Sequence, residues 1–144
     1  FSEPGQMDYV LRLIAERADG EAAVDALVRA ITAGLTGPRD PHDALELTRL
    51  RLTLTVPALQ AAVLQRLFDA QERLAEALRA TRPGELGELE SVALVGAVSG
   101  AMIAAARGAL ARELPVAEAV DGALGDIAAA LRGNSPGPRR RTAR

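Results

Sequence analysis

The 144-residue chain is predicted to be an all-α domain, a bundle of six helices in orthogonal and antiparallel packing. Three observations support this fold class. Apolar residues recur at spacings of three and four over most of the chain, which is typical of amphipathic helices. No stretch of alternating β-branched residues lies between turn signals, so strands are not expected. Short segments rich in Pro and Gly separate the periodic stretches.

The composition narrows the class of protein further. Apolar residues make up 49% of the chain but aromatic residues only 2%, so the core is expected to consist of Leu, Val, Ile and Ala. The chain has no Cys and a single His, His42, which excludes disulfides, thiolate chemistry and a His-rich metal site. Residues 139–144 contain four arginines and no acidic residue, so this segment carries a charge of +4. The rest of the chain has 13 arginines and 19 acidic residues, so its net charge is −6. A surface with this negative charge is poorly suited to binding nucleic-acid phosphates.

The first two helices are predicted over residues 6–17 and 21–33. Asp19-Gly20 breaks the first helix, and Gly34 lies near the end of the second. Each helix carries one apolar face, formed by Met7, Val10, Leu11 and Ile14 in the first and by Val24, Leu27, Val28 and Ile31 in the second.

Proline marks the borders of the next two helices. Asp40 and Pro41 suit the cap and the first turn of the third helix. Pro57 ends that helix and opens the fourth, which is predicted over residues 57–80. Pro83-Gly84 forms the turn that follows. The main apolar stripe of the fourth helix consists of Leu59, Val63, Leu67, Leu74 and Leu78.

The rest of the chain is arranged around the fifth helix, predicted over residues 89–110. Residues 92–106 contain one hydroxyl side chain and no charge, and this run is shorter than the about 20 residues that a bilayer span needs. A helix that is apolar on every side must be covered on every side, which a lone small subunit seldom achieves. Small residues form a ladder at every fourth position, at Gly96, Gly100, Ala104 and Gly108. We interpret the ladder as a contact with a second copy; packing inside the subunit is the alternative.

The sixth helix is predicted over residues 116–132, beginning after Pro115, with Gly133 as its stop. Ser135-Pro136-Gly137-Pro138 and the arginines after it predict a disordered basic tail over residues 133–144, separate from the domain at 1–132. We expect this tail to be solvated; contact with DNA phosphates or an acidic partner is the alternative. No secretory signal or membrane span is recognised, so a cytoplasmic protein is expected.

The order and spacing of these helices resembles the C-terminal sensor domain of TetR-family transcriptional regulators, over roughly residues 1–132. The opening from Phe1 to Met7 is similar to the family's junction segment, with Pro4 at the place of the usual Lys. Thr55-Val56-Pro57-Ala58-Leu59 is similar to the Pro-marked passage between the family's sixth and seventh helices. The helices over 89–110 and 116–132 resemble the pair that builds the family's dimer interface.

The resemblance implies a homodimer in which the last two helices of each copy form a four-helix interface. It also implies that DNA is read by an N-terminal helix-turn-helix absent from these 144 residues. The residues predicted at the dimer interface are Val92, Gly96, Gly100, Ile103, Ala104, Gly108, Val120, Leu124 and Ile127.

The resemblance further implies that a small, mostly apolar or amphipathic effector binds among the first five helices. The polar candidates interrupt apolar faces and are expected to orient the ligand. Their alternative roles are a bond from Ser99 to its own helix, solvent exposure of Gln71 and Arg49, and a helix end at Thr53. The residues predicted to contact the effector are Leu11, Ile14, Leu27, Arg49, Leu52, Thr53, Leu64, Phe68, Gln71, Ser99 and Met102.

Catalysis is not expected. Neither Ser91 nor Ser99 lies in a G-x-S-x-G context, and the sequence contains no Glu-x-x-His pair for a metal site. No cofactor or metal is therefore predicted. The rival interpretation is a helical dimerisation or interaction module without a small-molecule site. A membrane-surface protein is not expected, because the polar faces are as acidic as they are basic.

Overall fold

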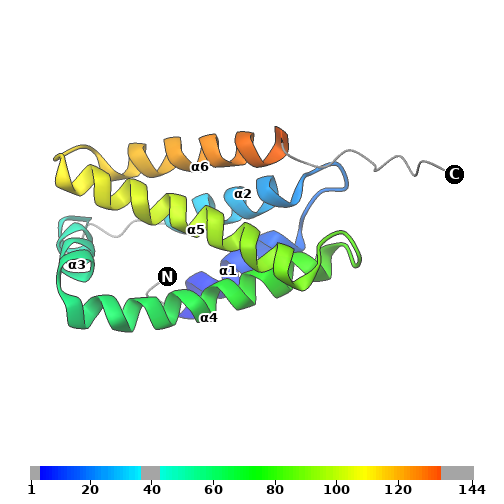
Figure 1. The fold of residues 1–144 in the computed structure, drawn as a ribbon, viewed down its shortest axis with the longest axis horizontal. Helices are drawn as coiled ribbons and strands as arrows, with labels where there is room; N and C mark the ends of the chain where they lie inside the picture. Colours follow the sequence, from blue (N-terminus) through cyan, green and yellow to red (C-terminus); the bar gives the residue numbers. More distant parts are fainter. Residues whose placement is uncertain (1–3, 37–42, 134–144) are drawn as a thin grey trace, which may run out of the picture.

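The computed structural model describes residues 4–36 and 43–133, and this part of the chain is all-α without strands (Figure 1). The all-α, six-helix prediction is confirmed, and the predicted helix ends lie within three residues of the observed ones. The expectations for Asp40, Pro41 and the basic tail beyond Gly133 lie outside the described residues. The helices are α1 (Pro4–Ala15), α2 (Ala23–Thr36), α3 (Asp43–Thr55), α4 (Pro57–Thr81), α5 (Glu88–Ala111) and α6 (Val116–Gly133).

The long helices are arranged around α5. Figure 1 shows α4 and α6 on opposite sides of the bundle, with α5 running between them. α5 packs most extensively against α6 and next against α4, whereas α1 packs against α2 and α4. α3 stands at one end of the bundle, between the start of α4 and the α5–α6 turn, and packs mainly against α4.

The hydrophobic core lies where α1, α2, α5, α6 and the C-terminal half of α4 meet. Every one of these helices contributes aliphatic side chains at helical spacing, because each has one apolar face. Among the described residues no aromatic side chain is fully buried, as the low aromatic content predicts. The largest fully buried apolar side chains are Ile14, Leu27, Ile31, Leu78, Leu124, Val10, Val95 and Val98.

Local sequence signals account for the ends of α4 and α5. Pro57 occupies the first turn of α4, where its missing N–H costs nothing. After α4, the chain reverses in a turn closed by the Glu85 N–H and the Arg82 carbonyl (3.2 Å), with Gly84 at φ +86°. Pro83 followed by a positive-φ Gly is the pattern of a type II turn. Glu88 and Glu90 then place negative charge at the positive start of α5.

By length and composition, α5 is apolar enough to cross a membrane, and it is the one such helix among the described residues. The uncharged run at 92–106 is shorter than a bilayer span, but the whole helix extends over 24 residues. In the fold, α5 packs between α4 and α6 and buries Ser91 and Ser99 together with its aliphatic residues. We therefore describe it as a core helix of a helical domain.

Candidate effector surface and dimer face

The apolar stripe of α4 leaves the core halfway along the helix. Leu74 and Leu78 are 2% and 1% exposed, whereas Leu59 and Val63 of the same stripe are 43% and 36% exposed. Leu64 and Phe68, which border the stripe, are 49% and 55% exposed. α1 covers α4 from about the level of Arg73, whose guanidinium lies 3.4 Å from the Asp8 carboxylate near the start of α1. Beyond that level α3 is the neighbour of α4, so the N-terminal half of the stripe is left open.

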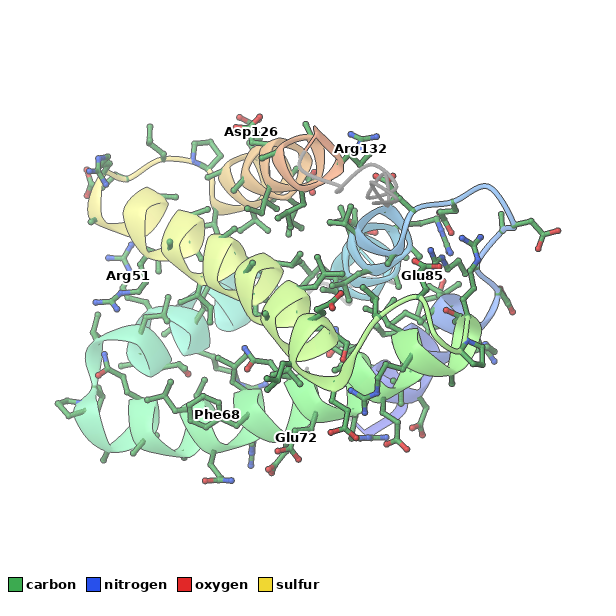
Figure 2. The ribbon with its side chains drawn as sticks, turned by 45° about the vertical axis from the view of Figure 1, so that its right-hand side comes forward. Arg51, Phe68, Glu72, Glu85, Asp126 and Arg132 are labelled. Carbon is green, nitrogen blue, oxygen red and sulfur yellow. The ribbon has the colours of Figure 1, made fainter. Side chains whose placement is uncertain are left out.

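We call this open region the α3–α4 apolar surface. Figure 2 shows Phe68 on the part of α4 that lies beside α3. All five members are at least 36% exposed, and an exposed apolar cluster of this kind marks a ligand or partner site. Its members are Leu52 of α3 and Leu59, Val63, Leu64 and Phe68 of α4.

A hollow of about 580 Å³ lies between α3 and the α5–α6 turn. Figure 2 shows Arg51 rising from α3 toward that turn, and Glu113 lines the same hollow from the other side. The lining mixes these charges with apolar side chains, as is usual for a site that takes an amphipathic ligand. The remaining lining residues are Thr48, Leu110, Leu114, Pro115 and Val116.

A second hollow of about 340 Å³ separates α4 from the start of α5. Its rim is acidic, with Glu72, Glu76 and Glu88 around Arg79 and Val92. Arg79 donates a hydrogen bond to the Oγ of the buried Ser91 (2.7 Å), so this hollow is bordered by a fixed structural contact. None of the eleven residues predicted to contact an effector lines either hollow.

The structure separates the predicted effector residues into three groups. Leu52, Leu64 and Phe68 are exposed members of the α3–α4 apolar surface, and Arg49 is exposed on the same helix as Leu52. Thr53, Gln71 and Met102 are partly buried, as is Leu11, which packs against the core.

Three predicted effector residues belong to the packed interior instead. Ile14 and Leu27 have no exposed surface, and Ser99 is 3% exposed. Ile14 and Leu27 lie where α1 and α2 pack together, so a ligand reaches them only by displacing the core. These three residues are therefore part of the core in this structure, and their contact with an effector stays a prediction. The periodicity of each helix identified its apolar face. It did not show which part of that face the neighbouring helices cover.

The outward face of α5 is built almost entirely from small residues. An added Cβ at Gly96 or Gly100 would meet no atom within 4 Å, so the ladder faces away from the subunit. At Gly108 the added Cβ would lie 3.3 Å from the Arg112 guanidinium, which partly covers that end. Exposed positions along the face are Leu89, Ala93, Ala97, Gly100, Ala104, Arg107 and Ala111.

On α6 the predicted interface residues point the other way. Val120 is 7% and Leu124 1% exposed, and Ile127 packs against the same core. These residues form the apolar stripe that fastens α6 to α2 and α5, so they are not available to a second copy. We therefore correct the α6 part of the interface. Its outward side consists of Glu118, Asp121, Gly122, Gly125, Asp126 and Ala129.

The outward side of α6 could have been predicted from the periodicity of its sequence. Gly122, Gly125 and Ala129 recur at the spacing of one helical face, opposite the stripe of Val120, Leu124 and Ala128. The prediction assigned the larger side chains of α6 to the dimer interface. In an amphipathic helix, however, the stripe of larger apolar side chains usually packs into the core of its own subunit. On α5, the exposed Ala93, Ala97 and Arg107 were also missed.

The described residues contain no group of three acidic or His side chains placed to hold a metal ion. What the fold presents is a helical core with two uncovered apolar regions, which is the build of a binding and assembly domain.

The chain belongs to the MftR C-terminal domain family of TetR-type regulators, whose profile matches residues 21–132. The resemblance inferred from the sequence is thereby confirmed. This family is not enzymatic, which agrees with the expectation of no catalysis. No curated protein and no solved structure matches the chain.

Proposed function

We propose that this chain binds a small, mostly apolar or amphipathic effector at the α3–α4 apolar surface and dimerises through α5 and α6. The observation that supports the effector site is the distribution of exposed apolar side chains. Five of the ten exposed large apolar residues of the described chain lie on α3 and α4, two helices that pack against each other. A solvent-facing cluster of Leu, Val and Phe is unfavourable unless a ligand or a partner covers it.

The regulatory consequence follows from differential binding. A ligand that contacts α3 and α4 shifts the protein only if it prefers one arrangement of the helices over another. α1 packs directly on α4, so its position is the feature that such a ligand would bias. In a cytoplasmic dimer, moving α1 changes the spacing between two helix-turn-helix segments outside these residues, and operator affinity falls. Unchanged operator affinity of the full-length regulator at saturating effector would reject this mechanism.

The effector site is tested with a neutral fluorescent probe, N-phenyl-1-naphthylamine, titrated into the 144-residue chain. We expect saturable fluorescence enhancement, and we expect the double variant Leu64→Gln/Phe68→Gln to bind at least about tenfold more weakly, since each lost apolar contact removes ~1 kcal/mol or more. The matched control is Leu35→Gln, which changes an exposed Leu on α2 and leaves the site intact.

Two results decide the effector proposal. Equal weakening in the double variant and in Leu35→Gln contradicts the α3–α4 apolar surface as the site. An absence of saturable binding, combined with no compound that raises the melting temperature, favours the interaction module without a small-molecule site.

The dimer proposal is supported by the outward face of α5. Gly96 and Gly100 face open space in the subunit, although each interior Gly costs a helix roughly 1 kcal/mol relative to Ala. Close approach of a second helix explains why glycines occupy these positions. An isologous interface built from α5 and α6 of two copies covers the exposed small residues, and this is the usual symmetry of homodimers.

Gly100 provides the test of the dimer. In an isolated subunit Gly100→Ala is expected to stabilise α5 by about 0.5–1 kcal/mol, because no atom blocks the new methyl group. At a close helix contact the same methyl weakens association, and Gly100→Leu weakens it further. Sedimentation equilibrium measures association and urea unfolding measures stability. Ala62→Leu, at an exposed position of α4, is the control. A Gly100→Leu dimer as tight as the original would count against this face.

A further inference from the structure

Four charged side chains on the outward faces of α5 and α6 have no ionic partner among the residues that the structure describes. Arg107 is the one charged residue between Ser91 and Ala111, and it is exposed. Glu118, Asp121 and Asp126 are exposed on α6, and Figure 2 shows Asp126 directed away from the bundle. Within residues 4–36 and 43–133, none of these four side chains makes a hydrogen bond or an ion pair.

The α5–α6 hairpin places three of these charges at the same end. Arg107 lies one turn before the end of α5 at Ala111, and Glu118 and Asp121 lie in the first two turns of α6. At 1.5 Å per residue, all three are within about 8 Å of the hairpin turn along the helix axes. Asp126 lies about 15 Å from the turn, measured by the same rise per residue. The α5 side of this end is therefore positive and the α6 side negative.

We propose that each Arg107 pairs with Glu118 or Asp121 of the partner subunit, across a two-fold axis parallel to the α5–α6 hairpin. This inference rests on the proposed dimer. Rotation about such an axis keeps every residue at its own level along the helices and sets α5 opposite the partner's α6. The cation of each copy then faces the acids of the other, and the two equivalent pairs lie at the same end of the interface, one on each side of the axis.

The other orientation of the axis matches the charges less well. A two-fold axis perpendicular to the helices, through the middle of the hairpin, sets α5 against the partner's α5 in antiparallel fashion. Arg107 would then face that helix at about the level of Val92. The nearest acids there, Glu88 and Glu90, lie to either side of the outward face rather than on it. The parallel axis is the one that sets Arg107 opposite an acid on the outward face itself, Glu118 of α6, and the small residues beside these charges allow the two hairpins to approach.

A charge-swap experiment tests the pairing with two variants of the full 144-residue chain. The first is Arg107→Glu, and the second is Glu118→Arg/Asp121→Arg. Each creates like charges across its own dyad, so sedimentation equilibrium at about 50 mM salt should show self-association weakened at least about tenfold. Mixing the two variants restores opposite charges at both contacts, and a heterodimer about as tight as the original dimer is expected.

The matched control is Asp126→Arg, which changes a charge on the outward side of α6 but at a different level. Its self-association is expected within about twofold of the original, and circular dichroism checks that all variants keep their helices. A monomeric original chain would refute the proposed dimer itself. A dimeric original chain whose Arg107→Glu variant associates equally well, or variants that do not combine on mixing, would overturn the pairing while leaving the dimer in place.

Discussion

Arg17 and Glu85 are 68 residues apart in the chain, and their side chains meet at 2.7 Å. The Arg17 side chain is 2% exposed and uses its other nitrogens to donate to the Glu21 carbonyl (2.8 Å) and to Thr81 Oγ1 (3.2 Å). From the other side, Arg82 donates to the carbonyls of Ala18 and Asp19. This clamp joins the α1–α2 connection to the α4–α5 turn, which are the two loops at one end of the bundle.

The clamp predicts a large loss of stability for Arg17→Ala. The change removes three hydrogen bonds from a buried guanidinium, and we expect the free energy of unfolding to fall by about 2–3 kcal/mol. Urea unfolding followed by circular dichroism measures this loss. Arg73→Ala is the control, since Arg73 and Asp8 form an exposed pair that is expected to contribute less than about 0.5 kcal/mol. Equal effects of the two substitutions would show that the clamp is not a stabilising contact.

Two carboxylates predict the acid sensitivity of the fold. The hydrogen bond from Arg17 lowers the pKa of Glu85 below the ordinary value of 4.5, and the hydrogen bond from Arg29 does the same for the pKa of Glu21. A lowered pKa in the folded state means that the unfolded chain binds more protons in acid. The stability is therefore fully present above about pH 4.5 and is lost as the pH falls through the lowered pKa values.

The variant Glu85→Gln tests this linkage. Between pH 6 and 7 its cost is modest, about 0.5–1 kcal/mol, because the Glu85 side chain is 34% exposed and solvent screens the pair. Below about pH 4.5 the stability of the variant is expected to fall less steeply than that of the original chain. Unfolding free energies measured at steps across pH 3–7 check the prediction. Parallel curves for the two proteins would contradict it.

The buried hydroxyl of Ser91 is expected to stabilise the fold through its two hydrogen bonds. It is fully buried, accepts a hydrogen bond from Arg79 (2.7 Å) and donates one to the Glu88 carbonyl (2.9 Å). We expect Ser91→Ala to reduce the free energy of unfolding by about 1–2 kcal/mol, because the Arg79 guanidinium loses an acceptor in a partly buried place. Val92→Ala, at the neighbouring and exposed position, serves as the reference in the same unfolding experiment.

Glu113 predicts a stabilising substitution. It is the one non-Gly residue with positive φ (+55°) in the described chain, and it directly follows the cap of α5 at Arg112. A side chain in this left-handed conformation costs roughly 1 kcal/mol or more, whereas Gly adopts it without strain. The greater conformational entropy of Gly in the unfolded chain offsets part of this gain. Glu113→Gly is therefore expected to raise the free energy of unfolding by about 0.5–1 kcal/mol. A lower melting temperature for this variant would contradict the argument.

The helices and their ends follow from the sequence because their causes are local. Pro57, Pro83-Gly84 and Pro115 impose backbone geometry on their own neighbours, and the observed borders lie where these residues predict them. The outward position of Gly100 also follows from the sequence, since the apolar ladder and the bulkier stripe occupy different sides of one helix. The family membership was recognisable for the same reason, from the order and spacing of the helices.

The tertiary structure decided which apolar stripes are covered. Phe68 and Leu78 belong to the same helix, yet one is 55% and the other 1% exposed, because α1 covers only one half of α4. Leu124 was expected in the dimer and lies in the core, since α6 uses its larger stripe to pack on α2 and α5. The clamp between Arg17 and Glu85 likewise depends on two distant loops meeting. Periodicity within a helix reports that a face is apolar, but only the packing of other helices determines what that face contacts.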